Sequence, residues 1–340
     1  MDYQFYMKRC IQLAQKALGE TYPNPLVGSV IVHNDRIIGE GYHKKAGEAH
    51  AEINAINSVQ NKELLKEATI FVSLEPCAHH GKTPPCANAI LNYGIPIVVI
   101  GAMDPHEKVN GKGKEILENA GVTVHTGILE KECRELNKIF FTYQQKQRPY
   151  ITLKWAESSD GFLDKDFSPI KISNSLTSQL VHQIRSEQQG IMVGTNTVLH
   201  DNPSLTTRLL CGNNPVRIII DWDLKIPADY TIFNDEAPTI IFNTIKEEQN
   251  YNIHWCKIEK ENAIENMMNR LFHLQIQSIL VEGGAFTLQE FIRNDIWDEI
   301  IIIKNHDLKL YNGTKAPKLN IKPNKTRNIR TDLVEFYQQS

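Results

Sequence analysis

The chain has 340 residues, of which 41% are hydrophobic, and its formal net charge is −3 at pH 7. This length is typical of two domains of roughly 150 residues each. The acidic balance lacks the basic footprint of a nucleic-acid-binding domain, and the longest apolar run, residues 95–103, is far too short to span a membrane. The N-terminus carries no apolar signal core and the cysteines form no disulfide-like framework, so we expect reduced thiols and a cytoplasmic protein.

The first half is predicted to be an α/β sheet with helices packed on it. Hydrophobic residues at steps of four and three predict a helix over residues 2–19. β-branched residues predict strands over 27–32 and 36–42, paired as a hairpin across Asn34-Asp35. The other elements expected in this half are helices opening at residue 50 and covering 86–93 and 127–141, and strands over 69–74, 95–101 and 122–124.

One imidazole, two thiols and one carboxylate in this half are of the kinds that form a hydrolytic zinc site. They belong to His50, Cys77, Cys86 and Glu52. Catalytic zinc keeps three protein ligands and one open position for water, whose pKa it lowers to near 7. The pattern H-x-E…P-C-x-x-C is the signature of zinc deaminases, with the Glu as general acid and base. This chain matches its first part, but eight residues rather than two separate the cysteines.

The segment between the two cysteines, residues 78–85, is rich in proline and polar groups and is predicted to be a loop. Such a loop can return Cys86 to the metal and carry His79, His80 and Lys82 to the edge of a substrate pocket. A structural zinc site normally has four protein ligands, for which His79 and His80 are the only local candidates. Structural zinc or no metal are the alternatives to the catalytic zinc that we favour.

The polar stretch 144–149 is predicted to be an interdomain linker, which divides the chain into domains 1–145 and 146–340. Beyond it, strands and helices alternate, and their order favours a mainly parallel sheet. Strands are expected over 151–156, 190–194, 216–221, 239–242, 278–282 and 299–304, and helices over 175–187, 261–274 and 287–292. No G-x-G-x-x-G follows any of these strands, so the usual dinucleotide fingerprint is absent. The tail from Asn305 is assigned no chemistry.

Most of the chain, to about Lys304, resembles the bifunctional deaminase/reductase family of riboflavin biosynthesis. In the first half the resemblance is carried by Asn24-Pro25-x-Val27-Gly28, Gly39-x-Gly41-x-His43, His50-Ala51-Glu52, the PCxHHGxTPPC loop and Asp104-Pro105 with Val109, Gly111 and Gly113. In the second half it is carried by Leu153-Lys154, Asp160-Gly161, Val193-Gly194-Thr195-x-Thr197, Asp201-Asn202-Pro203-x-Leu205-Thr206-x-Arg208 and Val281-Glu282-Gly283-Gly284. The chain departs from the family at His106, which is usually Asn, and at Lys171, where many relatives have an aromatic residue.

The resemblance implies an α/β protein with an N-terminal cytidine-deaminase-like zinc domain followed by a dihydrofolate-reductase-like domain. It implies hydrolytic deamination of 2,5-diamino-6-(5-phosphoribosylamino)pyrimidin-4(3H)-one, then NADPH-dependent reduction of the ribosyl group to ribityl, giving 5-amino-6-(5-phosphoribitylamino)uracil. The implied cofactors are Zn²⁺ and NADPH, and the implied partner is this small-molecule substrate. We also expect the protein to form a homo-oligomer.

The resemblance also implies roles for single residues. In the first domain it makes His50, Cys77 and Cys86 the zinc ligands, Glu52 catalytic, and Asn24 and His43 substrate-binding. In the second it makes Lys154 a proton donor or electrostatic guide, Arg185, Leu205, Arg208 and Glu282 substrate-binding, and Ala156, Thr197, Asp201, Gly283 and Gly284 cofactor-binding. Thr197 and Asp201 are expected to flank a loop. Judged by residue type, the two arginines and Lys154 could also be solvated surface side chains, and the glycine pair a simple turn.

Two other functions compete with this interpretation. One is a nucleic-acid or free-nucleobase zinc deaminase with a non-catalytic C-terminal domain. The acidic balance and the eight-residue spacing count against it. The other is a zinc-stabilised module in which one domain has lost catalysis and serves in assembly or regulation. The intact candidate residues of both halves count against that.

Overall fold

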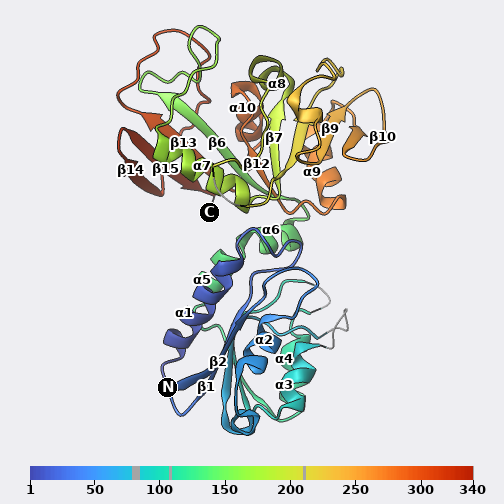
Figure 1. Cartoon of the computed structure of the whole chain (residues 1–340), viewed down its shortest axis with the longest axis vertical. Coiled ribbons are helices and arrows are strands. Elements are labelled where there is room, and N and C mark those ends of the chain that lie inside the picture. Colours follow the sequence, from blue (N-terminus) through green and yellow to red (C-terminus); the bar gives the residue numbers. More distant parts are fainter. Residues whose placement is uncertain (79–84, 107–108, 210–211, 340) are drawn as a thin grey trace. The chain divides into compact units, whose positions relative to one another are not determined.

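A computed structural model of the chain describes all residues except 79–84, 107–108, 210–211 and 340. The structure consists of two compact units, residues 1–146 and residues 147–340 (Figure 1). Within the described part of the chain, no helix is both long and apolar enough to cross a lipid bilayer.

The N-terminal unit is built on a five-stranded sheet with the strand order β2-β1-β3-β4-β5. Its strands are β1 (Gly28–His33), β2 (Arg36–Tyr42), β3 (Thr69–Leu74), β4 (Ile97–Ala102) and β5 (Thr123–Thr126). Strand β1 is antiparallel to both neighbours, whereas β3, β4 and β5 are parallel. The carboxyl ends of β3 and β4 therefore lie at the same sheet edge as the start of β1.

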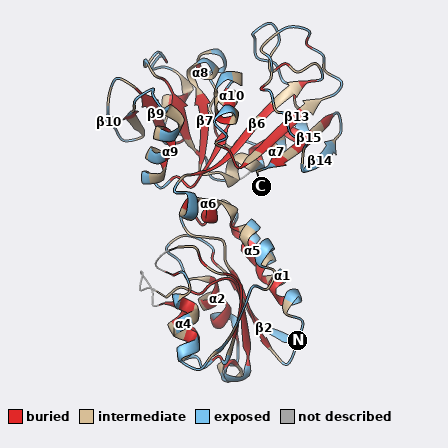
Figure 2. Ribbon diagram, turned by 180° about the vertical axis from the view of Figure 1, so that it is seen from behind, coloured by how far each residue is buried: buried red, intermediate tan, exposed pale blue. Residues whose placement is uncertain are grey.

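Helices cover both faces of this sheet, and the buried residues between the layers are red in Figure 2. The helical elements are α1 (Tyr3–Ala14), η1 (Gln15–Ala17), α2 (Ala51–Ser58), η2 (Lys62–Glu67), α3 (Cys86–Asn92), α4 (Lys112–Asn119), α5 (Glu130–Leu136) and α6 (Lys138–Lys146). Met7 of α1, Cys133 of α5 and Phe140 of α6 share one hydrophobic cluster. Helices α2, α3 and α4 contribute to the cluster on the opposite face.

Two glycines on β2 allow α2 to pack directly on the sheet. A Cβ atom at Gly41 would lie 2.3 Å from the backbone nitrogen of Ala55, and one at Gly39 would lie 2.6 Å from the carbonyl oxygen of Ala55. Any side chain there would push the helix away, because backbone atoms cannot rotate aside. The Gly39-x-Gly41 motif therefore sets the position of α2, and with it the residues at its start.

The C-terminal unit contains a ten-stranded sheet with the order β10-β11-β9-β8-β7-β12-β6-β13-β15-β14. Its strands are β6 (Tyr150–Ser158), β7 (Gly190–Gly194), β8 (Val216–Ile220), β9 (Thr239–Asn243), β10 (Glu248–Gln249), β11 (Ile253–Lys257), β12 (Ser278–Val281), β13 (Glu299–Asn305), β14 (Lys325–Ile329) and β15 (Asp332–Gln338). The seven central strands from β11 to β13 are parallel, and the strands outside them are antiparallel.

The described part of the C-terminal unit also contains four helices and a short 3₁₀ helix: α7 (Ser175–Glu187), α8 (Thr195–Asp201), η3 (Thr231–Phe233), α9 (Ala263–His273) and α10 (Ala285–Arg293). Helices α9 and α10 contribute to one hydrophobic cluster. Helices α7 and α8 contribute to two clusters that lie on the other face of the sheet. The residues that follow the parallel strands meet at one edge, where α/β proteins place their ligands.

The predicted α/β class is confirmed, and several elements are corrected. The helix predicted over 127–141 is two helices. They are broken at Asn137, whose buried side chain bonds both the N–H and the C=O of Leu26 at 2.8 Å. Helix α6 runs through the first part of the predicted linker. The loop predicted between Thr197 and Asp201 is the helix α8.

Further elements were missed by the sequence analysis. They include α4, the 3₁₀ helices η2 and η3, strands β10 and β11, and the hairpin of β14 and β15 in the tail that was assigned no chemistry. Strand β15 pairs along the whole of β13, from Glu299 to Asn305. Val334, Phe336 and Tyr337 within it are residue types that favour strands, so a local signal for this strand was present in the sequence.

Candidate catalytic sites

Three candidate zinc ligands meet at one edge of the N-terminal sheet. His50 is the N-cap residue of α2, Cys77 follows β3, and Cys86 is the first residue of α3. Nδ1 of His50 lies 3.5 Å from Sγ of Cys77 and 3.3 Å from Sγ of Cys86. All three ligand atoms lie within 4.8 Å of one another.

This triangle fits a zinc ion. A tetrahedral site with Zn–N of about 2.0 Å and Zn–S of about 2.3 Å has N–S edges of about 3.5 Å, close to the two distances observed. The pKa of the Cys77 thiol is lowered, mainly by the hydrogen bond with the Cys86 side chain. Burial opposes this shift, and His50 adds to it. The thiolate is the form that binds a metal. Three ligands leave the fourth tetrahedral position for water or substrate.

Glu52 lies in the first turn of α2, and only 3% of its surface is exposed. Burial, and then the charge of Cys77, raise its pKa to about 7. A carboxyl group with this pKa can both release and take up a proton near neutral pH, as a general acid and base requires.

Asn24 and His43 are brought to the same site. The amide of Asn24 lies 3.0 Å from Nε2 of His43, and Nδ1 of His43 lies 3.2 Å from the carbonyl oxygen of Ala49. Because a carbonyl oxygen can only accept a hydrogen bond, the ring hydrogen of His43 is placed on Nδ1. Nε2 then accepts a hydrogen bond from the amide of Asn24. Burial lowers the pKa of His43. The rings of His43 and His50 are 5.3 Å apart, in edge contact.

Glu75 is a further residue of this site, which was not among those predicted from the sequence. Its buried carboxylate accepts hydrogen bonds from the backbone N–H groups of Asp104, Gly111 and Lys114, at 3.3, 3.0 and 3.1 Å. It therefore anchors the backbone at these three positions after β4, beside the ligands. An acidic residue between a buried strand and a Pro-Cys pair was the only signal for it. The candidates His79, His80 and Lys82 lie outside the described residues.

A second charged cluster lies in the C-terminal unit. Val281 pairs with Leu153, so Glu282 follows β12 directly beside Lys154 of β6. Oε1 of Glu282 lies 3.5 Å from Nζ of Lys154, and Oε2 lies 2.5 Å from Nη2 of Arg185 on α7. Burial alone would raise the pKa of Glu282, but Lys154 and Arg185 outweigh it and lower the pKa to about 2. The carboxylate therefore holds both cations in place.

Arg208 and Leu205 belong to the segment that follows α8. Arg208 is exposed, and its Nη1 donates to the hydroxyl of Ser204 at 3.0 Å. Leu205 has a φ of 54° and its side chain packs in a core cluster, so only its backbone can contact a substrate. The backbone N–H of Arg208 donates to Nδ1 of His182 at 3.2 Å. His182, buried on α7, was not identified from the sequence.

The glycine pair meets the start of α8. The N–H of Gly284 donates to Oγ1 of Thr197 at 2.9 Å, and a Cβ at Gly283 would lie 3.1 Å from the nitrogen of Gly194. Helices α8 and α10 both begin here without a side-chain cap. Their free N–H groups suit an anionic group such as the pyrophosphate of a dinucleotide.

Three further residues were predicted or questioned for cofactor binding. Asp201 is exposed, one helical turn beyond Thr197 on α8. Ala156 is half-buried on β6, two residues after Lys154 and therefore on the same face of the strand. Lys171 is exposed in the segment between β6 and α7.

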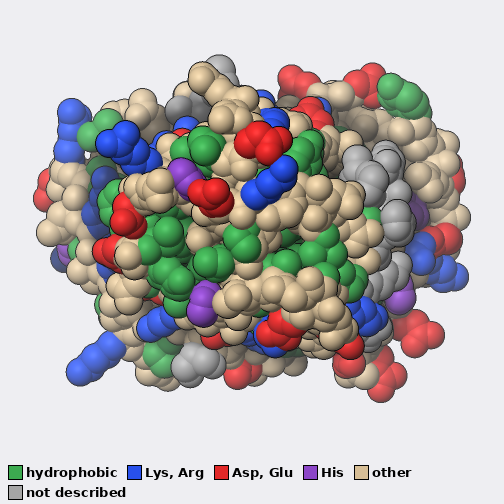
Figure 3. Space-filling model, turned by 90° about the horizontal axis from the view of Figure 1, so that it is seen from below, with side chains coloured by type: hydrophobic (Ala, Val, Ile, Leu, Met, Phe, Trp, Pro, Cys, Tyr) green, Lys and Arg blue, Asp and Glu red, His purple; other side chains and the backbone are tan. Residues whose placement is uncertain are grey.

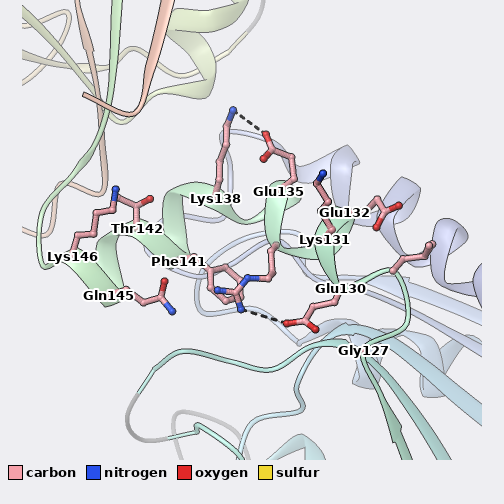
Figure 4. Close-up of a pocket in the computed structure, with 12 residues that line it drawn as sticks. Gly127, Glu130, Lys131, Glu132, Glu135, Lys138, Phe141, Thr142, Gln145 and Lys146 are labelled. Carbon is pink, nitrogen blue, oxygen red and sulfur yellow. Dashed lines mark ion pairs between the residues drawn. The ribbon is translucent and has the colours of Figure 1, made fainter. Parts of the chain in front are cut away.

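Two other features of the described residues do not form a catalytic site. Glu247, His254 and Cys256 form a triangle that could hold a metal, but the guanidinium of Arg270 already contacts Glu247 as its cation. A hollow of about 720 Å³ runs along α5 and α6 (Figure 4). Its charged side chains pair with one another, as Glu130 does with Arg134 and Glu135 with Lys138. None of the candidate residues above lines it.

Comparisons with known proteins match both units. Residues 1–102 match the family model of the cytidine and deoxycytidylate deaminase zinc-binding region, and residues 149–305 match the RibD C-terminal domain. The riboflavin biosynthesis protein RibD of Aquifex aeolicus is 39% identical over 98% of both chains. That of Escherichia coli is 33% identical over 89% of this chain and 87% of its own.

A crystal structure from Thermotoga maritima has nearly the same fold. It is described as a diaminohydroxyphosphoribosylaminopyrimidine deaminase/5-amino-6-(5-phosphoribosylamino)uracil reductase. It is 36% identical to this chain, with a TM-score of 0.89 over 99% of both chains.

Proposed function

Because the chain belongs to the RibD family of bifunctional riboflavin-biosynthesis proteins, we propose that its two activities are divided between residues 1–146 and 147–340. The protein is a zinc-dependent deaminase and an NADP-dependent reductase. The first unit would deaminate the phosphoribosylaminopyrimidine, and the second would reduce the ribosyl group of the product. The two clusters support this division, since each is formed within one unit.

In the deaminase, His50, Cys77 and Cys86 would hold zinc, and Glu52 would carry the protons. Zinc bound there supplies a water that ionises near neutral pH and can act as a nucleophile. Glu52 takes a proton from the attacking water and delivers it to the leaving nitrogen, so that a C–O bond forms, the C–N bond breaks and ammonia departs. The buried carboxyl of Glu52, in the first turn of α2 beside the ligand triangle, is the observation that supports this role.

Asn24 and His43 would bind the pyrimidine. Their side chains are hydrogen-bonded to each other beside His50, which leaves the second hydrogen of the Asn24 amide and its oxygen for a substrate. The neutral His43 fixes the direction in which that amide points. This arrangement supports a role in orienting the ring that is deaminated.

In the reductase, Lys154 would donate a proton as the ribose ring opens, and Glu282 would orient its ammonium group. NADPH bound at the Gly283-Gly284 turn supplies the hydride. Arg185 and Arg208 would bind the substrate phosphate. The buried Nε of Arg185 has no hydrogen-bond partner among the described residues, so this donor is available to a phosphate oxygen.

We also propose a homo-oligomer in the cytoplasm that does not bind nucleic acid. Hydrophobic side chains gather in the middle of the face seen in Figure 3, as on surfaces that contact other proteins. The five cysteines that the structure describes form no disulfide, which suits a reducing compartment. Light scattering on protein eluting from a size-exclusion column would measure its molar mass in solution. A mass of one chain, 38.8 kDa, would exclude a homo-oligomer.

The test of the function is to incubate the full-length protein with the diaminopyrimidine ribosyl phosphate, with and without NADPH, and to identify the products by mass. Without NADPH we expect a deaminated product that keeps its ribosyl group, and with NADPH the ribityl compound. Deamination of free cytosine or of single-stranded DNA, with this substrate untouched, would contradict the proposal.

A further inference from the structure

His182 connects the two arginines of the candidate phosphate site. It lies on α7 one helical turn before Arg185, and its Nδ1 accepts the backbone N–H of Arg208 at 3.2 Å. The side chain is buried. One helix therefore carries Arg185 itself and the group to which the backbone of Arg208 is attached.

The segment that presents Arg208 needs such attachments, because its backbone is not in a relaxed conformation. Leu205 adopts a φ of 54°, in the left-handed region that side chains with a Cβ disfavour. Arg217, fully buried on β8, donates its Nε to the carbonyl oxygen of Ser204 at 2.9 Å. The segment is thus held at Ser204 by the sheet and at Arg208 by α7.

The charges around His182 favour its neutral form. Arg185 on α7, Arg208 on the loop, Lys154 on β6 and Glu282 after β12 all act on it. Burial first, and then Arg185 and Arg208, lower its pKa, so the ring is neutral at pH 7. Because Nδ1 accepts a hydrogen bond, the ring hydrogen is on Nε2. A second hydrogen on Nδ1 would face the N–H of Arg208 and break the bond.

We propose that His182 is a positioning residue for phosphate recognition in the reductase, which holds the backbone of Arg208 so that its guanidinium and that of Arg185 converge on one phosphomonoester. The inference rests on the proposed role of Arg208. It predicts that loss of the acceptor weakens binding of the substrate phosphate, while hydride transfer to a bound substrate continues. The bond also fails when the ring is protonated.

The experiment compares His182→Leu and His182→Asn in the full-length enzyme, with the deaminated intermediate and NADPH. Leucine has no acceptor, and we expect its KM for the intermediate and the inhibition constant of inorganic phosphate to rise about tenfold, the equivalent of one hydrogen bond. The kcat, the KM for NADPH and ammonia release should change less than about twofold. Asparagine offers Oδ1 in place of Nδ1 and should restore both constants. His273→Leu, which removes an exposed histidine from the end of α9, is the matched control.

Lowering the pH provides a second readout that a packing defect would not give. In the wild type the KM for the intermediate should rise with falling pH as the His182 ring becomes protonated. In His182→Asn, which has no ring to protonate, the part of this rise that His182 causes should be absent. If His182→Leu does not fold, this comparison decides the question. Identical profiles in the two proteins would overturn the inference.

Arg208→Ala tests the phosphate role of Arg208 separately from the positioning role of His182. If it leaves the KM and the phosphate inhibition constant unchanged, the proposed phosphate role of Arg208 is wrong. If it raises both constants while His182→Leu does not, the role of Arg208 stands and the positioning inference is overturned.

Discussion

Glu52 illustrates how burial changes the chemistry of a single side chain. With only 3% of its surface exposed, it has a pKa of about 7 in place of the ordinary 4.5. We expect Glu52→Gln to retain stoichiometric zinc but to lose ammonia release by a factor of about 10²–10⁴, since glutamine cannot transfer the proton. Metal analysis and an ammonia assay would measure this.

The reductase provides the control for this variant. Reduction of the already deaminated intermediate by Glu52→Gln should proceed at the wild-type rate, because no residue of the second cluster is altered. Near wild-type ammonia release by the variant would show that Glu52 is not the proton carrier.

The buried carboxylate of Glu282 should make the free energy of unfolding depend on pH. Its pKa of about 2 in the folded protein is below the ordinary value of 4.5, so the unfolded chain takes up the proton first as the pH falls. The ion pairs of Glu282 with Lys154 and Arg185 therefore make their full contribution to the free energy of unfolding at pH values above 4.5. This contribution, roughly 3 kcal/mol, is lost as the pH falls toward 2.

Tryptophan fluorescence can measure this loss in the C-terminal unit alone. All four tryptophans, Trp155, Trp222, Trp255 and Trp297, lie in residues 147–340. The free energy of unfolding should fall less steeply with acid in Glu282→Gln than in the wild type, whereas Glu259→Gln, at an exposed position, should keep the wild-type slope. Equal slopes in all three proteins would show that the Glu282 ion pairs do not contribute.

The contact between α2 and β2 is the element on which the metal site depends. A Cβ at Gly41 would lie 2.3 Å from the nitrogen of Ala55, so Gly41→Val must displace α2 from the sheet. Overpacking of this kind costs about 1–3 kcal/mol. Since His50 and Glu52 sit at the start of α2, we expect the variant to lose zinc and ammonia release together.

Arg36→Val is the matched control, because it adds the same side chain to the exposed start of β2. It should retain zinc and activity. A zinc-loaded, active Gly41→Val protein would mean that the helix can adjust without moving the ligands.

At the scale of the whole molecule, we expect the two units to respond independently to metal removal. Zinc stabilises only the unit that binds it, because a ligand adds stability to the folded form with which it interacts. Chelation should abolish ammonia release and lower the unfolding midpoint of the N-terminal unit, followed by circular dichroism. It should leave NADPH oxidation and the tryptophan transition unchanged, and added zinc should restore the loss. A shifted tryptophan transition would show that the units are thermodynamically coupled.

Motif spacing and local periodicity were sufficient to predict the α/β class and most central strands. The same spacing predicted that His50, Cys77 and Cys86 would meet, as they do in the structure. Such predictions succeed because they depend on short-range signals: a buried parallel strand is a run of apolar residues, and a ligand before a helix is held by that helix. The sequence determined, by itself, the residue types that the two chemistries need.

Only the tertiary structure decided which buried groups support those residues. Glu75 accepts from the backbone N–H of Lys114, His182 accepts from that of Arg208, and Asn137 breaks a helix to bond Leu26, 111 positions away. Each of these depends on a partner that is distant in the chain, and no local pattern of hydrophobic or polar residues specifies which distant backbone group a buried side chain will meet.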